Sequence, residues 1–313
     1  MPRLSPHLLI RARRIDPLLA SLLRVTRTLD SATTELRWLR AHAATTATAT
    51  DSAAATLRSY VYRRSILAEP LQYILGDQPF GPTSMLCRRG VLIPRAETEE
   101  SASHLAGLLP RGSKVVDLCT GSGCISLLLA AETDVSVVGV DFSHHALRLS
   151  MENLQHNADV IRPASQVKFM EGDVLAQDED ELLYSIHACF DEMVPEYTNV
   201  DVVVSNPPYI SADGYARETA RSVRNWEPRV ALEAADHGDV FYPRIGEIAW
   251  NLGARAVVAE VGGWSQAERV RAIWEEMGWE GSAIWKDFAG RGRTVVAWRE
   301  GGEWIAEGPN PPT

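Results

Sequence analysis

The sequence predicts an α/β protein in which a mostly parallel, doubly wound sheet follows a small all-helical domain. Short, valine-rich strand-like runs alternate with helical runs from residue 115 onward. The first 75 residues instead show helical periodicity. Between these parts, residues 76–95 are rich in Gly and Pro, which break regular structure. Alternating strands and helices are typical of a parallel sheet covered on both faces.

The N-terminal domain is expected to span residues 1–75. Leucines spaced by three and four residues over 15–42 predict two helices, with Asp30 or Ser31 as the N-cap of the second. A further helix is expected over 52–67. The Ala/Thr-rich stretch 43–50 has no large apolar residue, which predicts a flexible connection.

The second domain is expected to span residues 96–300, after a linker over 76–95 with room for a short hairpin. Strands are expected at 115–118, 135–140, 167–170, 200–205, 256–261 and 294–298, and helices at 98–109, 124–131, 143–156 and 265–277. Residues 176–198 are acidic and are interpreted as an irregular insertion. Residues 301–313 are expected to form a disordered tail.

Composition and charge exclude several classes of protein. The 313 residues are 45% hydrophobic, and no apolar run approaches the roughly 18 residues of a membrane span. Four cysteines without a C-x-x-C pair predict reduced thiols in an intracellular compartment and no metal site. The net charge is −10, yet residues 1–64 carry 11 Arg against 4 acidic residues. The acidic remainder argues against binding of a long nucleic acid, which needs a basic face.

The arginine-rich start has two interpretations. Arg3, Arg11, Arg13 and Arg14 all precede the first acidic residue, Asp16, as in a mitochondrial transit peptide. An ordinary basic first helix fits equally well. The sequence therefore leaves a mitochondrial and a cytoplasmic location open.

A glycine loop predicts a nucleoside site. The strand ending in Asp117-Leu118 is followed by C-T-G-S-G, residues 119–123, and then by an apolar helix. Glycines let such a turn approach a ligand closely, and Asp141 ends the next strand, where an acid accepts hydrogen bonds from ribose hydroxyls. An N-cap role is the alternative for Asp141. Because the loop lacks the full G-x-G-x-x-G and any G-K-[ST], S-adenosylmethionine (SAM) fits better than NAD. The cofactor residues predicted are Asp117, Cys119, Thr120, Gly121, Ser122, Gly123, Asp141, Asp173, Val174 and Asn206.

The tetrad Asn206-Pro207-Pro208-Tyr209 is the predicted catalytic element. Because proline is excluded from central strands, the preceding strand must stop at Ser205. Asn206 Oδ1 and the Pro207 carbonyl are expected to accept hydrogen bonds from a planar NH2 group, and the Tyr209 ring to stack on it. A simple strand terminator is the structural alternative. The tetrad does not choose among adenine, cytosine, guanine, glutamine and asparagine as the methyl acceptor.

The chain resembles the HemK/PrmC family, the release factor glutamine methyltransferases, in several motifs. These are E-P-L-Q-Y-I-L-G at 69–76, L-I-P-R-A-E-T-E at 92–99, D-L-C-T-G-S-G at 117–123, S-N-P-P-Y-I at 205–210, E-P-R-V-A-L at 227–232, A-E-V-G at 259–262 with Gln266, and K-D-F-A-G-R-G-R at 286–293. Two departures are Cys119, where the family usually has Gly, and the longer insertion at 176–198. The insertion and the arginine-rich start point to an organellar, eukaryotic-type member.

This resemblance implies a Rossmann-like SAM-dependent methyltransferase sheet whose last strand is antiparallel. It implies SAM as donor, S-adenosylhomocysteine as product, and the glutamine of a class I release factor's G-G-Q motif as acceptor. The N-terminal domain would help to grip that release factor. We expect a monomer that uses no metal, membrane or nucleic acid. The alternatives are a nucleic-acid exocyclic-amine methyltransferase and an inactive protein of the same fold.

Overall fold

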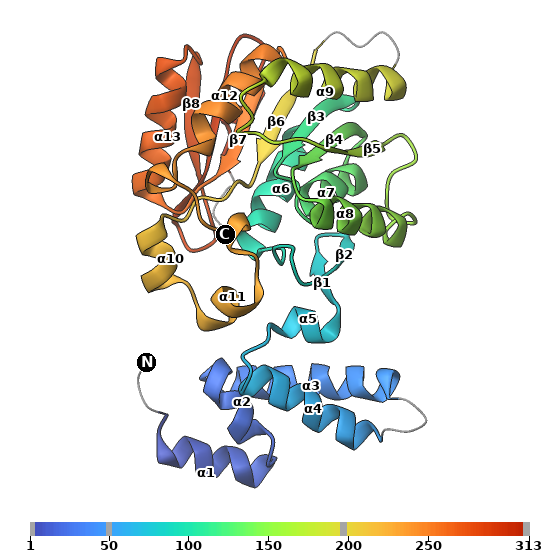
Figure 1. Ribbon diagram of the computed structural model, residues 1–313, viewed down its shortest axis with the longest axis vertical. Helices are drawn as coiled ribbons and strands as arrows, with labels where there is room; N and C mark the ends of the chain where they lie inside the picture. The colour runs from blue at the N-terminus through green and yellow to red at the C-terminus, as the bar shows by residue number, and fades with distance from the viewer. Residues whose placement is uncertain (1–3, 48–51, 195–198, 309–313) are drawn as a thin grey trace. The chain divides into compact units, whose positions relative to one another are not determined.

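The computed structural model describes residues 4–47, 52–194 and 199–308 (Figure 1). The chain divides into two compact units. The helical unit comprises Met1–Asp77 together with Thr219–Glu227, and the sheet unit comprises Gln78–Glu218 together with Pro228–Thr313.

The helical unit is built from short amphipathic helices around a leucine core. Its fully buried side chains include Leu19, Leu22, Leu23 and Leu39. The helices are α1 (Pro6–Ile15), α2 (Leu19–Thr26), α3 (Leu29–Thr46), α4 (Ala53–Ser65), α5 (Leu71–Leu75) and α11 (Arg221–Trp226). Two internal ion pairs hold α4 in place: Arg64 binds Glu35 of α3 at 2.8 Å, and Arg63 binds Glu69 of the loop after α4 at 2.7 Å.

Helix α3 differs from the sequence prediction at both ends. Its N-cap is Thr28, whose hydroxyl accepts the Ser31 N–H at 3.2 Å, so neither Asp30 nor Ser31 is the cap. It continues to Thr46, so residues 43–46 are helical rather than a flexible connection. Alanine has the highest helix propensity, and Ala43 is buried, which explains the longer helix. Residues 48–50 of the predicted connection lie outside the described residues.

One part of the helical unit comes from far along the chain. Residues 219–227, which include α11, follow the N-P-P-Y tetrad in sequence but cluster with the N-terminal helices. Trp226 Nε1 donates to the Leu67 carbonyl at 3.0 Å within this unit. Sequence periodicity alone gave no sign of this return, because a six-residue helix carries too little pattern.

The sheet unit contains a two-stranded hairpin and a seven-stranded sheet of order β5-β4-β3-β6-β7-β9-β8. The strands are β1 (Asp77–Phe80), β2 (Thr83–Leu86), β3 (Ser113–Leu118), β4 (Val135–Asp141), β5 (Gln166–Glu171), β6 (Val202–Ser205), β7 (Ala256–Glu260), β8 (Gly281–Lys286) and β9 (Gly292–Trp298). The first five strands of the order are mutually parallel, and β9 is antiparallel to both neighbours. The predicted fold class is confirmed.

Both faces of the sheet are covered, which requires strands that are apolar on both sides. In β3, Val116 and Leu118 pack toward α9, α12 and α13, whereas Val115 packs toward α6 and α7. Figure 1 shows these helices around the sheet. The helices of this unit are α6 (Ala96–Leu108), α7 (Cys124–Glu132), α8 (His144–His156), α9 (Glu179–Met193), α10 (Ala212–Glu218), α12 (Phe241–Asn251) and α13 (Trp264–Glu276).

Besides α10 and α12, the regular elements of this unit that were not expected from the sequence include α9, β8 and a short 3-10 helix. Residues 179–193, interpreted as irregular, form α9, which buries Leu182, Ile186, Phe190 and Met193 at spacings of four, four and three. Strand β8 lies at a sheet edge with only Trp285 buried, so its apolar pattern is weak. Beyond residue 300, η3 (Glu303–Ala306) buries Ile305, so part of the predicted tail packs on the sheet unit. Residues 195–198 and 309–313 lie outside the described residues.

We predict that Gly139, in the middle of β4, tolerates no side chain. A Cβ at this position would lie 2.6 Å from Phe169 Cδ1 and 3.0 Å from Thr120 Oγ1. Overpacking of this kind costs about 1–3 kcal/mol, so Gly139→Ala should lower the thermal midpoint by several degrees. The matched control is Gly107→Ala in α6, where a Cβ meets nothing within 4 Å. That change should leave the midpoint equal or higher. Equal midpoints for the two variants would contradict the packing.

Candidate active site

A cavity of about 390 Å³ lies in the sheet unit at the carboxyl ends of the parallel strands. Loops that follow β3, β4, β5 and β6 line it, and residues 90–95 and 230–235 complete its wall. Ligands of open α/β sheets bind at this edge, because the loops that leave parallel strands converge there. The cavity is therefore the candidate active site.

The loop after β3 turns through three residues with left-handed backbone. Cys119 has φ +60°, Gly121 φ +57° and Gly123 φ +80°. At Gly123 a Cβ would lie 2.8 Å from Phe169 Cζ, so glycine is required both for conformation and for space. Cys119 keeps the glycine-like conformation although it has a side chain, so this departure from the family pattern leaves the loop geometry intact.

Asp117 supports this loop from beneath and does not line the cavity. Its Oδ2 accepts the hydroxyls of Thr120 and Ser126, each at 2.6 Å. Its Oδ1 has no hydrogen-bond partner in the described part of the chain. Burial raises the Asp117 pKa to about 6, against the lowering effect of the bonds from Ser126 and Thr120. A direct contact of Asp117 with the cofactor stays a prediction, whereas its bonds to Thr120 and Ser126 give it a role in shaping the loop.

Asp141 lines the cavity and also fixes the glycine loop. Its Oδ2 accepts the Gly121 N–H at 2.9 Å, and its Oδ1 accepts the Ser143 N–H at 2.9 Å. Burial raises its pKa, while these two backbone bonds lower it. The N-cap of α8 is Ser143, whose hydroxyl accepts the Ala146 N–H, so Asp141 is not the cap. Its carboxylate is available to a ligand at the place where the ribose was expected.

The loops after β4 and β5 form the adjoining wall. Asp173 and Val174, the residues predicted here to bind the cofactor, line the cavity. Phe142, directly after Asp141, also lines it with 54% of its surface exposed. A half-exposed aromatic ring at the rim suits the flat face of a purine.

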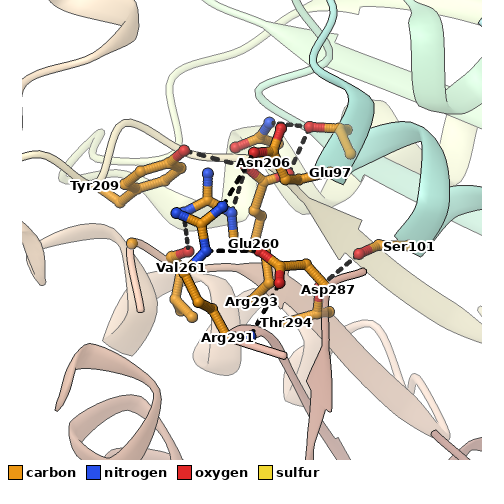
Figure 2. A network of polar contacts seen from close by, with 12 residues as sticks. Glu97, Ser101, Asn206, Tyr209, Glu260, Val261, Asp287, Arg291, Arg293 and Thr294 are labelled. Carbon is orange, nitrogen blue, oxygen red and sulfur yellow. Dashed lines mark hydrogen bonds and ion pairs between the residues drawn. The ribbon is translucent and has the colours of Figure 1, made fainter. Parts of the chain in front are cut away.

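The N-P-P-Y tetrad begins where β6 ends, at Ser205, as the two prolines predicted. Asn206 and Pro208 line the cavity. The Asn206 Nδ2 donates to Thr98 Oγ1 of α6 at 2.9 Å. The Asn206 Oδ1 has no hydrogen bond within the described residues. Figure 2 shows this side chain beside those of Tyr209 and Glu260.

Glu260, the last residue of β7, connects these groups although its side chain is only 3% exposed. Its Oε2 accepts the Thr98 hydroxyl at 2.5 Å, and its Oε1 accepts the Tyr209 hydroxyl at 3.1 Å. Arg293 Nε lies 3.9 Å from Oε1, and its guanidinium stands 5.5 Å from the centre of the Tyr209 ring. Burial raises the Glu260 pKa, and the Thr98 bond and the Arg293 charge oppose that shift. The residues of this network, drawn in Figure 2, come from α6, the loop after β6, β7 and β9.

The backbone at the end of the tetrad is held by hydrogen bonds as well. Gln266 of α13 donates to the Tyr209 carbonyl at 3.2 Å and to the Gly238 carbonyl at 3.1 Å. Gly238 approaches so closely that a Cβ there would lie 2.2 Å from the Tyr209 carbonyl oxygen. Ile210 exchanges backbone hydrogen bonds with Leu232 and Ala234, each at 2.9 Å. The E-P-R-V-A-L motif thus holds, through Leu232, the segment that follows the tetrad.

The predicted site residues fall into two groups. Those that line the cavity are Cys119, Thr120, Gly121, Ser122, Asp141, Asp173, Val174, Asn206 and Pro208, whereas Asp117, Gly123, Pro207 and Tyr209 do not. Sequence reasoning assigned no role to Thr98, Phe142, Glu260 or Arg293. The signal was present, because three of these four lie within the motifs 92–99, 259–262 and 286–293.

The described residues contain neither a metal-binding cluster nor a membrane-spanning helix. Within residues 4–47, 52–194 and 199–308, no group of three or more His, Cys, Asp or Glu is placed to hold a metal ion. In the same residues, no helix combines the length and the apolar character needed to cross a membrane.

Comparisons with known proteins find methyltransferases. The family model "Methyltransferase small domain" matches residues 95–223. The Probable MRF1 mitochondrial N(5)-glutamine methyltransferase mtq1 of Schizosaccharomyces pombe is 35% identical over 249 residues, 74% of this chain and 75% of that protein. The Mitochondrial MRF1 N(5)-glutamine methyltransferase MTQ1 of Saccharomyces cerevisiae is 33% identical, over 74% of this chain and 68% of that protein. The Release factor glutamine methyltransferase of Thermodesulfovibrio yellowstonii is 31% identical, over 79% and 82%.

Among solved structures, the hMettl16 catalytic domain in complex with MAT2A 3'UTR hairpin 1 is similar in fold. It covers 99% of this chain and 96% of that chain, with a TM-score of 0.52 and 15% identity. At this level of identity the likeness concerns the fold alone.

The buried Asp117 predicts a specific pH dependence of stability. Its pKa is about 6 in the folded protein and 3.8 in the reference state, so folding takes up a proton between these pH values. Stability therefore falls as the pH rises through this window. We expect the unfolding free energy of the wild type, relative to Asp117→Asn, to fall by about 2 kcal/mol between pH 4 and pH 7. Urea unfolding of both proteins at several pH values measures this free-energy difference. A difference between the wild type and Asp117→Asn that does not change with pH would contradict an Asp117 pKa raised by burial.

Proposed function

The chain belongs to the release factor glutamine methyltransferase family, and from this premise we propose that it methylates the glutamine of the G-G-Q motif in a peptide-chain release factor. The methyl group goes to the side-chain amide nitrogen, and SAM is the donor. The observation that carries this proposal is Asn206, which has its amide nitrogen bound to Thr98 and its oxygen free beside the cavity.

The cavity fits SAM in size and in chemistry. Its volume of about 390 Å³ is in the range of ligand pockets of about 300–1,000 Å³. Asp141 offers a carboxylate for ribose hydroxyls, and Phe142 offers an aromatic face for adenine. The loop from Cys119 to Ser122 would lie along the methionine part. When bound, SAM supplies a methyl group on a positively charged sulfur.

The chain's own contribution is to position an amide that is a poor nucleophile. We assign Asn206 Oδ1 and the Pro207 carbonyl as acceptors for the two N–H bonds of the glutamine NH2 group. Neither oxygen has a hydrogen bond within the described residues, and proline provides no competing N–H. Holding the amide in this way aligns its nitrogen for attack, which is catalysis by orientation. The methylated nitrogen becomes acidic and releases its proton without a base that acts beforehand.

Tyr209 has a more constrained role than the sequence suggested. Its hydroxyl is bound to Glu260, and Arg293 stands over its ring. Its ring is partly buried and does not line the main cavity. Stacking on the glutamine amide stays a prediction, whereas the hydroxyl bond gives Tyr209 a second function in anchoring the loop.

A nucleic-acid exocyclic-amine methyltransferase is the alternative, because the tetrad suits any planar NH2 group. Residues 65–313 carry a net charge of about −17, counted from the sequence, which opposes a nucleic-acid substrate. Membership of the glutamine methyltransferase family favours the release factor, and the resemblance to hMettl16 is one of fold.

We infer a mitochondrial location for the substrate. Two relatives carry "mitochondrial" in their names, and the N-terminal residues are arginine-rich. A bacterial relative is similar over most of the chain, so a cytoplasmic enzyme is the alternative. Monomeric state stays a prediction.

The function is tested by offering both acceptor classes to one enzyme preparation. The purified protein is incubated with labelled SAM and either a recombinant mitochondrial class I release factor or total RNA. We expect label in the release factor alone, and peptide mass spectrometry should place one methyl group on the G-G-Q glutamine. Label in RNA, with none in the release factor, would establish the alternative.

For the cofactor, we predict that Asp141→Ala weakens SAM binding about 30-fold, which corresponds to about 2 kcal/mol for hydrogen bonds to a charged group. Part of this loss comes from Gly121, whose N–H loses its acceptor. Asp141→Asn keeps an acceptor and should bind better than Asp141→Ala. Isothermal titration calorimetry measures the affinities, and an unchanged affinity for Asp141→Ala would exclude the assigned role.

For the acceptor, we predict that Asn206→Ala binds SAM normally but transfers the methyl group about a hundredfold more slowly. Rate losses of this size follow the removal of one preorganised polar group that stabilises a transition state. Asn206→Asp should also be slow, because its carboxylate cannot donate to Thr98, whose hydroxyl proton already points to Glu260. Single-turnover rates at saturating SAM measure the step. A wild-type rate for Asn206→Ala would remove Asn206 from the mechanism.

A further inference from the structure

The Thr98 hydroxyl lies between the Glu260 carboxylate and the Asn206 side-chain amide, and it determines which end of that amide faces the cavity. Thr98 Oγ1 is 2.5 Å from Glu260 Oε2 and 2.9 Å from Asn206 Nδ2. A hydroxyl has one proton to donate, and an ionised carboxylate accepts only. The Thr98 proton therefore goes to Glu260, and the Thr98 oxygen must accept from its other neighbour.

This order of donors leaves a single orientation for the Asn206 amide. Its NH2 end must face Thr98, because two acceptors at that contact would repel each other. The oxygen end then faces the cavity, which Asn206 lines. In the reversed orientation the Asn206 NH2 group would meet the NH2 group of the glutamine, and two donors cannot bind each other. The direction of one buried hydrogen bond thus decides whether the site accepts an amide.

The other contacts of Glu260 favour the ionised, accepting carboxylate and oppose the effect of its burial. Tyr209 donates to Oε1 at 3.1 Å, and the Arg293 guanidinium lies 3.9 Å from the same oxygen. Glu260 itself is 3% exposed, and Thr98 is 4% exposed, so water does not compete freely for these groups. A donor and a cation on one carboxylate oxygen leave the second oxygen to receive the Thr98 proton.

We propose that Glu260 is a positioning residue of the methyl-transfer site, and that it acts through the Thr98 hydroxyl to hold Asn206 Oδ1 toward the substrate NH2 group. The proposal rests on the proposed function, since it concerns the acceptor of the same reaction. It also gives the motifs 92–99 and 259–262 one shared role, the orientation of the tetrad amide.

The test uses isosteric changes at Thr98 and a matched control. Thr98→Val removes the hydroxyl and keeps the shape, whereas Thr98→Ser keeps the hydroxyl. The control is Thr294→Val, which removes another buried hydroxyl nearby, one whose hydrogen bond goes to Ser101 at 2.7 Å instead of to Asn206. Turnover of the release factor, KM for the release factor, SAM affinity and the thermal midpoint are measured for each variant.

We expect Thr98→Val to lower kcat at least tenfold with SAM affinity within about twofold of the wild type. Thr98→Ser should recover most of kcat, and Thr294→Val should stay within twofold. A purely structural role would instead lower the thermal midpoints of both Val variants and leave the kcat of the folded protein unchanged. Wild-type kcat in Thr98→Val would overturn the proposal.

The path through Asn206 is tested by combining variants. Thr98→Val is introduced into Asn206→Ala, where the amide that it orients is absent. We expect less than a twofold further loss there, against at least tenfold in the wild type. An equal loss in both backgrounds would show that Thr98 acts independently of Asn206. It would overturn the proposal that Glu260 orients Asn206 through Thr98.

Glu260→Gln tests the carboxylate itself. Thr98 and Tyr209 donate to different oxygens of Glu260, and glutamine has an NH2 group in place of one of them, so one of the two hydroxyls would face a donor. In the wild-type background we expect Glu260→Gln to lower kcat at least tenfold. In the Thr98→Val background the same change should lower kcat less than threefold. If the wild type transfers no methyl group to the glutamine, the proposed function fails and this proposal with it. If the wild type is active and Glu260→Gln matches it, only the proposal fails.

Discussion

The carboxylate of Glu260 is the group on which the geometry of the active site depends. It binds Thr98 from α6 and Tyr209 from the loop after β6, and it lies beside Arg293 from β9. These residues are up to 195 positions apart, counted from Thr98 to Arg293 in the sequence. A buried charge is costly when it loses its partners, so the three elements are held in one arrangement. The N-P-P-Y loop is thereby fixed before any substrate arrives.

The cofactor half of the site is organised by the same physical means. Asp117 lies beneath the glycine loop and binds Thr120 and Ser126, while Asp141 binds the Gly121 N–H. Each acid holds a backbone turn, and only Asp141 also faces the cavity. Both ends of the site therefore use a buried acid from a strand end to shape a neighbouring loop. Rigid loops of this kind reduce the ordering that binding would otherwise require.

The sequence was sufficient for the fold class and for the end of the strand that precedes the tetrad. Valine-rich strands with helices between them predicted the sheet, and two prolines after Ser205 predicted where β6 ends. It was insufficient for β8, because an edge strand buries too little to show a pattern, and for α9, whose apolar residues are interrupted by acids. Glu260 was missed for a physical reason: its role comes from contacts with Thr98 and Arg293, and such long-range pairing has no local signature. The motifs of the resemblance contained these residues, but only the structure showed what they do together.

Neutron diffraction from crystals exchanged into D₂O tests the central claim directly, because it locates the deuterons that decide donor and acceptor. The account predicts a deuteron on Thr98 Oγ1 directed at Glu260 Oε2 and both Asn206 deuterons on the nitrogen that faces Thr98. The Asn206 oxygen would then face the cavity, ready for the NH2 group of the substrate glutamine. Deuterons on the cavity side of Asn206, or a protonated Glu260 that donates to Thr98, would contradict it.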